Sequence, residues 1–446
     1  MSSFIPKVPR TADTFALLLP GITSKSHNVC EDLLVKNHKA FHIFFNDHKF
    51  HNHFTHHLLA AYSLGATTEC LHKIFDEHSS YQRKFPELLP VRFDRQNYHE
   101  YLGKSEAYAN FLELFQKEID KHGPIDTVRR WVYSGDMLAR TIGGAFHPLI
   151  HIGYGLEFDV PGLIAEGLAM AACTTLDLHP LIDNLPPLED KLQPISASGA
   201  TPSALDQVTS NVTTKLDINA SPKSNPLVDI VQEIQQDKDF DGVVKFEDEV
   251  KIRTVLQNRK ATEKLKQYVA RWPVTPNKDD LQLKLRELYE ACVLTFGASA
   301  IRKEGIKLDF FLMHALTSVL FVHNFLPVLS AKEGKLLLQS HLSASLAFYV
   351  SRGRPTLQVD LLLNYQSPNA ISDSINPWNE VFALALKAKE VHVIKTVRSC
   401  AVGQILYGHK GLSSPLENAW LKAAQLALDK DGDWNFDGIG FDEAWK

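Results

Sequence analysis

Apolar residues recur at helical spacing along most of this chain, and alternating runs typical of strands are almost absent. Apolar residues three and four positions apart lie on one face of a helix. We therefore expect an all-α fold, and with 446 residues, of which 44% are hydrophobic, the chain can form one large multi-helix domain. The predicted helical segments are 27–75, 105–121, 124–142, 146–157, 160–175, 226–236, 246–272, 279–300, 307–324, 332–350, 377–390, 391–405 and 415–429.

A polar segment at about 184–226 interrupts this pattern. It is rich in Ser, Thr, Pro and Asn and poor in aromatic residues, a composition that does not bury enough apolar surface to fold. The segment is either a domain boundary or an insertion within one domain. We expect one domain over 1–446 with a disordered insertion, because a long surface loop adds little closure entropy.

The charge and the cysteines indicate a compartment and exclude some partners. The net charge of −5 and the pI near 6.5 do not indicate binding to nucleic acid or to an anionic membrane. No apolar run reaches the ~18 residues of a membrane span, and the first residues show no secretory signal. The five cysteines form no CxxC pair, so we expect reduced, mostly buried thiols. We therefore expect a cytoplasmic protein.

Motifs for other chemistries are weak. Residues 237–248 follow the calcium-binding EF-hand pattern with Asp at the last position, but EF-hands normally occur in pairs and no second loop is found. A capped acidic turn is the preferred interpretation. No G-x-G-x-x-G follows a predicted strand, so a Rossmann-type flavin or nicotinamide site is not expected.

Four segments place histidine inside apolar helical sequence. Histidines three or four positions apart share a helix face. A buried imidazole needs partners for both ring nitrogens, and a metal such as iron, copper or zinc supplies one. The alternative for any single histidine is a satisfied core residue, which we expect of His323 and His341, or a solvated one, which we expect of His42, His48 and His51. The four segments carry His53, His56 and His57, then His147 and His151, then His314, and finally His392.

Lys395 lies three residues after His392 in an otherwise apolar stretch. One interpretation is a lysine whose head reaches water along an apolar surface. The other is a buried amine close to a metal, with a lowered pKa. Such an amine can react with carbon dioxide to form a carbamate, which would supply the anionic ligand that the histidines lack.

At these motifs the chain resembles the questin oxidase-like proteins, known from fungal polyketide pathways. The segments that carry the resemblance are NHFTHHLLAAYSLGA at 52–66, FHPLIHIGYGLEF at 146–158, FLMHALTS at 311–318 and HVIKTVR at 392–398. The resemblance implies oxidative ring opening of an anthraquinone-type polyketide with dioxygen. Members have been described as Baeyer–Villiger-type oxygenases, a label that fits a flavin enzyme. Because no flavin fold is found, we expect a non-haem iron oxygenase, specifically a dioxygenase.

The resemblance also assigns site residues. The residues that match the family's motif positions are His56, His147, His151, His314, His392 and Lys395, and we expect them to hold Fe(II) with Lys395 carbamylated. We expect His53 to be an acid–base group or to orient a ligand, and Lys395 to be catalytic as well. The expected partners are a polycyclic aromatic substrate and dioxygen, and a reductase acting upstream is left open. Two alternatives remain: an NADPH-dependent Baeyer–Villiger-type monooxygenase on the same substrate class, and a non-catalytic helical binding protein with the histidines paired in its core.

Overall fold

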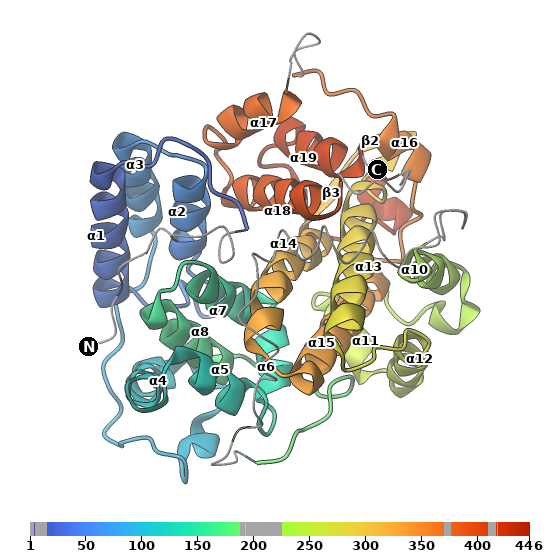
Figure 1. The fold of residues 1–446 in the computed structure, drawn as a ribbon. Helices are drawn as coiled ribbons and strands as arrows, with labels where there is room; N and C mark the ends of the chain where they lie inside the picture. Colours follow the sequence, from blue (N-terminus) through green and yellow to red (C-terminus); the bar gives the residue numbers. More distant parts are fainter. Residues whose placement is uncertain are drawn as a thin grey trace.

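The computed structural model describes residue 4 and residues 16–187, 192, 225–369, 376–408, 416 and 418–446. In this part of the chain each strand has two residues and helices make up nearly all of the regular structure, so the predicted all-α class is confirmed (Figure 1). The helices are α1 (Ser24–Ala40), α2 (Phe54–Ser63), α3 (Thr68–Ser79), α4 (Tyr108–His122), α5 (Pro124–Val132), α6 (Met137–Ile142), α7 (His147–Glu157), α8 (Pro161–Cys173), α10 (Pro226–Gln236), α11 (Lys251–Gln257), α12 (Arg259–Ala270), α13 (Lys278–Gly297), α14 (Phe310–Phe325), α15 (Ala331–Ser351), α16 (Val359–Leu363), α17 (Pro377–Ala385), α18 (Val391–Tyr407) and α19 (Ala419–Asp429). The strands are β1 (Ile301–Arg302), β2 (Gly305–Ile306), β3 (Leu308–Asp309) and β4 (Trp434–Asn435).

Three of the predicted helical segments are broken where capping or turn residues intervene. The segment 124–142 forms α5 and α6, because Gly135 adopts a left-handed conformation between them with φ of 54°. The segment 246–272 forms α11 and α12, because the side chain of Asn258 caps α12 by accepting from the amide of Ala261. The segment 27–75 forms α1, α2 and α3, with a histidine-rich loop before α2.

Helix α14 forms the centre of the core. It packs against α7, α13, α15 and α18, and Figure 1 shows it between the earlier and later parts of the chain. The expectation that no apolar run is long enough for a membrane span is wrong, because Phe310–Val328 is long and apolar enough; 72% of this stretch is buried by the rest of the protein. A helix that is hydrophobic all round is typical of such a core position. The five cysteines are unpaired and all but the half-buried Cys70 are buried, as expected.

Helices α7 and α8 are in backbone contact through two glycines. A Cβ atom on Gly155 would lie 2.9 Å from the amide nitrogen of Ile164, and one on Gly167 would lie 2.8 Å from that of Ile152. Only glycine permits this approach, because larger residues would push the two helices apart. The close packing brings the side chains at the start of α7 next to those of α8.

The C-terminal segment reaches the start of α14 through the parallel pairing of β3 and β4. Leu308 pairs with Trp434, and Asp309 pairs with Asn435. Asp309 also caps α14 and forms a buried ion pair with Arg352, with 2.9 Å between Oδ2 and Nε. These strands are too short to produce a periodic pattern, so the sequence did not predict them.

The predicted polar insertion at 184–226 lies mostly outside the described residues. At its two edges, Leu185 bridges to Gly135, and the side chain of Asn225 caps α10. The single domain therefore stays a prediction.

The acidic segment is a capped turn whose carboxylates are paired with cations. Asp237 accepts from the amide of Asp239 and forms an ion pair with Lys264 at 3.1 Å. Asp241 forms an ion pair with Arg354 at 2.7 Å. These contacts agree with the preferred interpretation of this segment as a capped acidic turn.

Candidate metal centre

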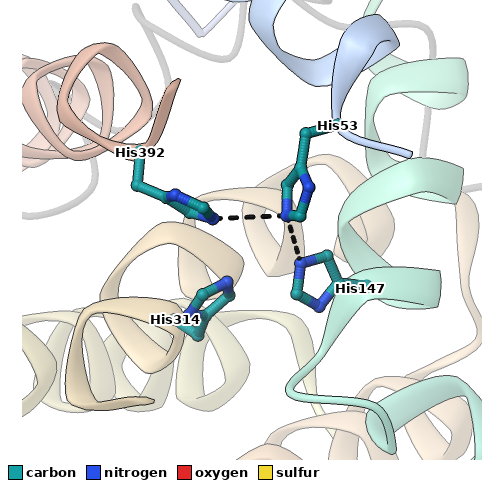
Figure 2. A group of neighbouring side chains, drawn as sticks. All are labelled: His53, His147, His314 and His392. Carbon is teal, nitrogen blue, oxygen red and sulfur yellow. Dashed lines mark hydrogen bonds between the residues drawn. The ribbon is translucent and has the colours of Figure 1, made fainter. Parts of the chain in front are cut away.

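Four buried histidines from four helices meet at one point. His53 is the N-cap of α2, His147 begins α7, His314 lies in the first half of α14 and His392 is the second residue of α18. One nitrogen from each ring lies within 4.8 Å of the others. Figure 2 shows the four rings turned toward a common centre. Neutral imidazole is a common metal ligand, so the group is a candidate metal centre.

In three of these rings Nδ1, the nitrogen that points away from the common centre, forms a hydrogen bond with an oxygen atom of the protein. His147 Nδ1 lies 2.7 Å from the Gly144 carbonyl, His314 Nδ1 lies 2.7 Å from the Phe310 carbonyl, and His392 Nδ1 lies 2.6 Å from the Glu390 carboxylate. Carbonyl and carboxylate oxygens accept, so Nδ1 carries the proton in each ring and Nε2 carries a lone pair. This is the arrangement that fixes metal-binding histidines.

The Nε2 atoms at the common centre have fewer hydrogen-bond donors around them in the described chain than they have lone pairs to satisfy. His53 Nε2 lies 2.9 Å from His147 Nε2 and 3.2 Å from His392 Nε2, the two dashed contacts in Figure 2. A single N–H of His53 can donate to only one of them at a time. His314 Nε2 has no hydrogen-bond partner in the described part of the chain. A cation at the centre would satisfy these acceptors together, so the donor set fits a divalent transition metal.

Burial keeps the four imidazoles neutral. It lowers the pKa of His147 to about 3, and it lowers the pKa values of His53, His314 and His392 well below the usual 6.5. The charge of nearby Lys395 adds to this effect for all four. At neutral pH each ring therefore offers the unprotonated form that a metal requires.

A strained turn places His147 at the start of α7. Gly144, Ala145 and Phe146 all have positive φ, of 54°, 51° and 64°. Residues other than glycine rarely adopt this conformation, and its cost is typical of functional sites. The turn directs the carbonyl of Gly144 at His147 Nδ1, so the strain orients this ring.

Lys395 is buried one turn after His392. The residue is 3% exposed, and its Nζ has no hydrogen-bond partner among the described residues. The interpretation of a lysine that reaches water is therefore wrong. Burial lowers the pKa of Lys395 to about 7, against the opposing effect of Glu390. The amine lies in a tightly packed place that it shares with Tyr154, Thr317 and Arg398 and that has no room for a water molecule.

His56 and His151, which we expected as ligands, lie outside the four-histidine group. His56 Nε2 contacts His151 Nδ1 at 3.1 Å, and His151 Nε2 contacts the Glu166 carboxylate at 2.8 Å. His38 bonds the other carboxylate oxygen at 2.7 Å. Burial raises the pKa of Glu166, but the hydrogen bonds from the two histidines bring it down to about 2. The ligand roles of His56 and His151 stay predictions that this geometry does not favour.

For four other histidines, the structure confirms two of the expectations drawn from the sequence and corrects the other two. His48 is exposed and His341 is a core residue bonded to Ser318 at 2.8 Å, both as expected. The expectation that His42 and His51 are solvated is wrong, because both are buried. The ring of His51 stacks on His147, with 4.0 Å between centroids and 7° between planes.

The sequence reasoning missed two carboxylates of the site, Glu166 and Glu390. Glu166 had a visible signal, since it is the one charged residue in the apolar helix Pro161–Cys173. Glu390 caps α18, accepts from Trp434 Nε1 at 2.6 Å and bonds the ring of His392. Its role depends on β4 bringing Trp434 to this place, which no local pattern reveals.

Comparisons with known proteins show the family of the chain, and the matched range includes all four histidine segments. A family model described as questin oxidase-like matches residues 50–400. The chain is 30% identical to the Baeyer–Villiger monooxygenase AacuH of Aspergillus aculeatus, with 96% of this chain and 91% of that protein covered. It is 27% identical to the Baeyer–Villiger oxidase AgnL3 of Paecilomyces divaricatus, with 100% and 96% covered. It is 25% identical to the questin oxidase of Aspergillus fumigatus, with 93% and 92% covered.

Proposed function

Because the chain belongs to the questin oxidase-like family, it is an oxidoreductase, and we propose that it is a non-haem iron oxygenase that opens a ring of an anthraquinone-type polyketide with dioxygen. The observation that carries the proposal is the convergence of His147, His314 and His392, each with its Nδ1 held by an oxygen and its Nε2 turned inward. Several imidazoles with open coordination positions suit iron that must also take up dioxygen.

The proposed ligands are His53, His147, His314 and His392. His53 thereby moves from the acid–base role that we expected to a ligand role, because its Nε2 lies between two of the other rings. His56 and His151 are assigned to the wall of the site, since their nitrogens bond each other and Glu166. When bound, Fe(II) would supply the activation of dioxygen. The chain itself orients the rings and keeps water from the buried centre.

Lys395 is proposed to supply an anionic ligand as a carbamate. The neutral Nζ forms a bond to the carbon of carbon dioxide, and one proton leaves the nitrogen to solvent. Burial favours the neutral amine near pH 7, and Nζ has no hydrogen-bond partner among the described residues that would compete with a carbamate. A high-resolution electron-density map that shows an unmodified Lys395 in iron-loaded protein would contradict this part of the proposal.

Metal analysis of the purified protein tests the iron centre. We expect about one iron per chain, loss of turnover of an anthraquinone substrate on chelation, and recovery on adding Fe(II) under anaerobic conditions. His314→Ala should lose iron, because His314 has no other partner for its Nε2. The matched control is His341→Ala, which removes an equally buried histidine bonded to Ser318 and should keep iron. Full activity in metal-free protein would refute the proposal.

The names of the relatives favour one second candidate, a Baeyer–Villiger-type monooxygenase, for which we propose NADPH as the reductant. Labelled dioxygen separates the two. A dioxygenase places both oxygen atoms in the product without consuming a reductant. A monooxygenase places one atom in the product and one in water, and it consumes one equivalent of reductant per turnover.

A further inference from the structure

A short C-terminal segment contacts the starts of two helices that each carry a proposed metal ligand. Helix α18 begins one residue before His392, and α14 begins four residues before His314. Residues 431–436, which include strand β4, reach both of these helix starts. We call residues 431–436 the C-terminal clamp.

At α18, the clamp holds Glu390, the N-cap residue that bonds the ring of His392. The carboxylate of Asp431 accepts from the backbone amides of Lys389 and Glu390 at 3.0 and 3.1 Å. Trp434 Nε1 donates to Glu390 Oε2 at 2.6 Å, and the other oxygen, Oε1, lies 2.6 Å from His392 Nδ1. Asp431 thus fixes the backbone of Glu390, and Trp434 fixes its carboxylate.

At α14, the clamp holds Asp309 and Phe310, the N-cap and the first residue of the helix. Asn435 pairs with Asp309 in the two-stranded sheet. The ring of Phe436 packs on that of Phe310, with 4.4 Å between centroids. The carbonyl of Phe310 lies 2.7 Å from His314 Nδ1 and accepts its proton. The orientation of the His314 ring therefore depends on a backbone group that the clamp contacts.

A buried arginine fixes the clamp to the rest of the protein. Arg352 is 3% exposed, and it donates to Asp309 at 2.9 Å and to the carbonyl of Phe436 at 2.5 Å. Its own carbonyl accepts from the amide of Gly440 at 2.8 Å. Segments near a chain end are poorly ordered unless such contacts hold them. The clamp is therefore part of the packed structure and can position other groups.

The two ligands that the clamp reaches are neighbours at the centre. The rings of His314 and His392 lie 5.1 Å apart between centroids. A metal site needs its ligand atoms within a few tenths of an ångström of their proper places, and residues behind the ligands provide that precision. A single segment bonded to both helix starts fixes where one ligand lies relative to the other.

We propose that the C-terminal clamp sets the spacing of His314 and His392, with Asp431 and Trp434 as positioning residues that act through Glu390. The inference rests on the proposed function, because it takes the metal centre from there. A coupling between two sites acts equally in both directions. Loss of a clamp contact should therefore weaken metal binding, and bound metal should hold the clamp more firmly.

The test is a titration of metal-free protein with Co(II), without substrate. It gives Kd and the visible absorption spectrum of the bound ion, which reports the ligand geometry. Trp434→Phe keeps an aromatic ring and removes the Nε1–H donor. We expect Kd to rise about three- to tenfold, less than the 10- to 100-fold typical of losing a direct partner of a ligating histidine. The absorption bands should shift, and Asp431→Asn should change Kd and the bands in the same direction.

Trp445→Phe is the matched control. Trp445 Nε1 also donates within the C-terminal part of the chain, but to the carbonyl of Ile439 at 2.8 Å, outside the clamp. Asp433→Asn removes a charge between Asp431 and Trp434. Both controls should keep the Kd and spectrum of the wild type. Amide hydrogen exchange adds a second measurement: Co(II) should slow exchange in the clamp of the wild type, and less so in Trp434→Phe.

Three results would overturn the clamp: a Trp434→Phe variant with the Kd and spectrum of the wild type, an equal loss in Trp445→Phe, or a wild type that binds no Co(II). If circular dichroism shows that Trp434→Phe does not fold, Asp431→Asn decides, because Asp431 is exposed and asparagine keeps its size. If the Co(II) results hold while the iron-loaded wild type does not turn over an anthraquinone, the clamp stands and the proposed function fails. Turnover by the wild type with unchanged Co(II) binding in both clamp variants gives the reverse.

Discussion

Replacing Lys395 by methionine removes a buried amine that no hydrogen bond compensates. The residue is 3% exposed, and its Nζ has no partner among the described side chains and backbone groups. Burial moves the pKa of this amine from 10.5 to about 7. The unfolded chain therefore binds a proton that the folded protein holds poorly, and this lowers the free energy of unfolding as the pH falls from 10.5 to 7.

The structure sets the size of the effect. At about 1.4 kcal/mol per pKa unit, the cost at pH 7 is about 5 kcal/mol. The pKa of about 7 already includes the attraction of Glu390, and imperfect packing of the new side chain offsets part of the gain. We therefore expect Lys395→Met to raise the free energy of unfolding of metal-free protein by about 2–4 kcal/mol at pH 7, because methionine fills similar space without a charge. The variant should at the same time lose iron binding and turnover.

Urea denaturation followed by circular dichroism measures the effect, in metal-free protein and in buffer depleted of carbon dioxide. The gain should shrink as the pH rises from 7 toward 10.5, because the amine is neutral in both the folded and the unfolded state only above the unfolded pKa of 10.5. The control is Lys73→Met, whose side chain is 75% exposed and which we expect to change stability by less than about 0.5 kcal/mol. A Lys395→Met variant no more stable than the wild type at pH 7 would refute the burial argument.

Three further predictions follow from the packing and charges of the site. Glu390→Gln should weaken iron binding about 10- to 100-fold in a metal titration, because the carboxylate that holds His392 Nδ1 is lost; unchanged affinity would contradict the role of this carboxylate. Gly167→Ala should lower the free energy of unfolding by about 1–3 kcal/mol, because the new Cβ would lie 2.8 Å from the backbone of α7. The control is Gly334→Ala, whose Cβ would meet only the ends of leucine side chains at 3.0 Å. This variant should be neutral or stabilising in the same measurement. Burial lowers the pKa of His341 to about 3, so metal-free protein should lose stability as the pH falls from 6.5 toward 3, and in urea denaturation at successive pH values His341→Asn should lose less over this range.

The sequence alone determined the fold class and most of the helices of the described chain, because apolar periodicity is a local property of each segment. It also indicated all four histidines of the candidate centre and Lys395, because polar groups within apolar helices stand out in a linear sequence. The sequence did not reveal the breaks at Gly135 and Asn258, where a single residue outweighs the periodicity around it.

Only the tertiary structure decided which nitrogens meet. His53 and His56 are three residues apart, yet His53 turns to His147 and His392, which lie 94 and 339 residues away in the chain, while His56 turns to His151. His53 does so because it is the N-cap of α2 rather than a residue within it. Spacing along one helix predicts which side chains share a face, but not which distant helix that face meets.

The carboxylates that support the site were decided in the same way. Glu166 reaches His151 because glycines hold α7 and α8 in backbone contact, and Glu390 meets Trp434 because β3 pairs with β4. These contacts join segments far apart in the sequence, and each depends on how closely two backbones approach. The sequence therefore identified the residue types of the centre, and the packing of the helices determined the partner of each ring.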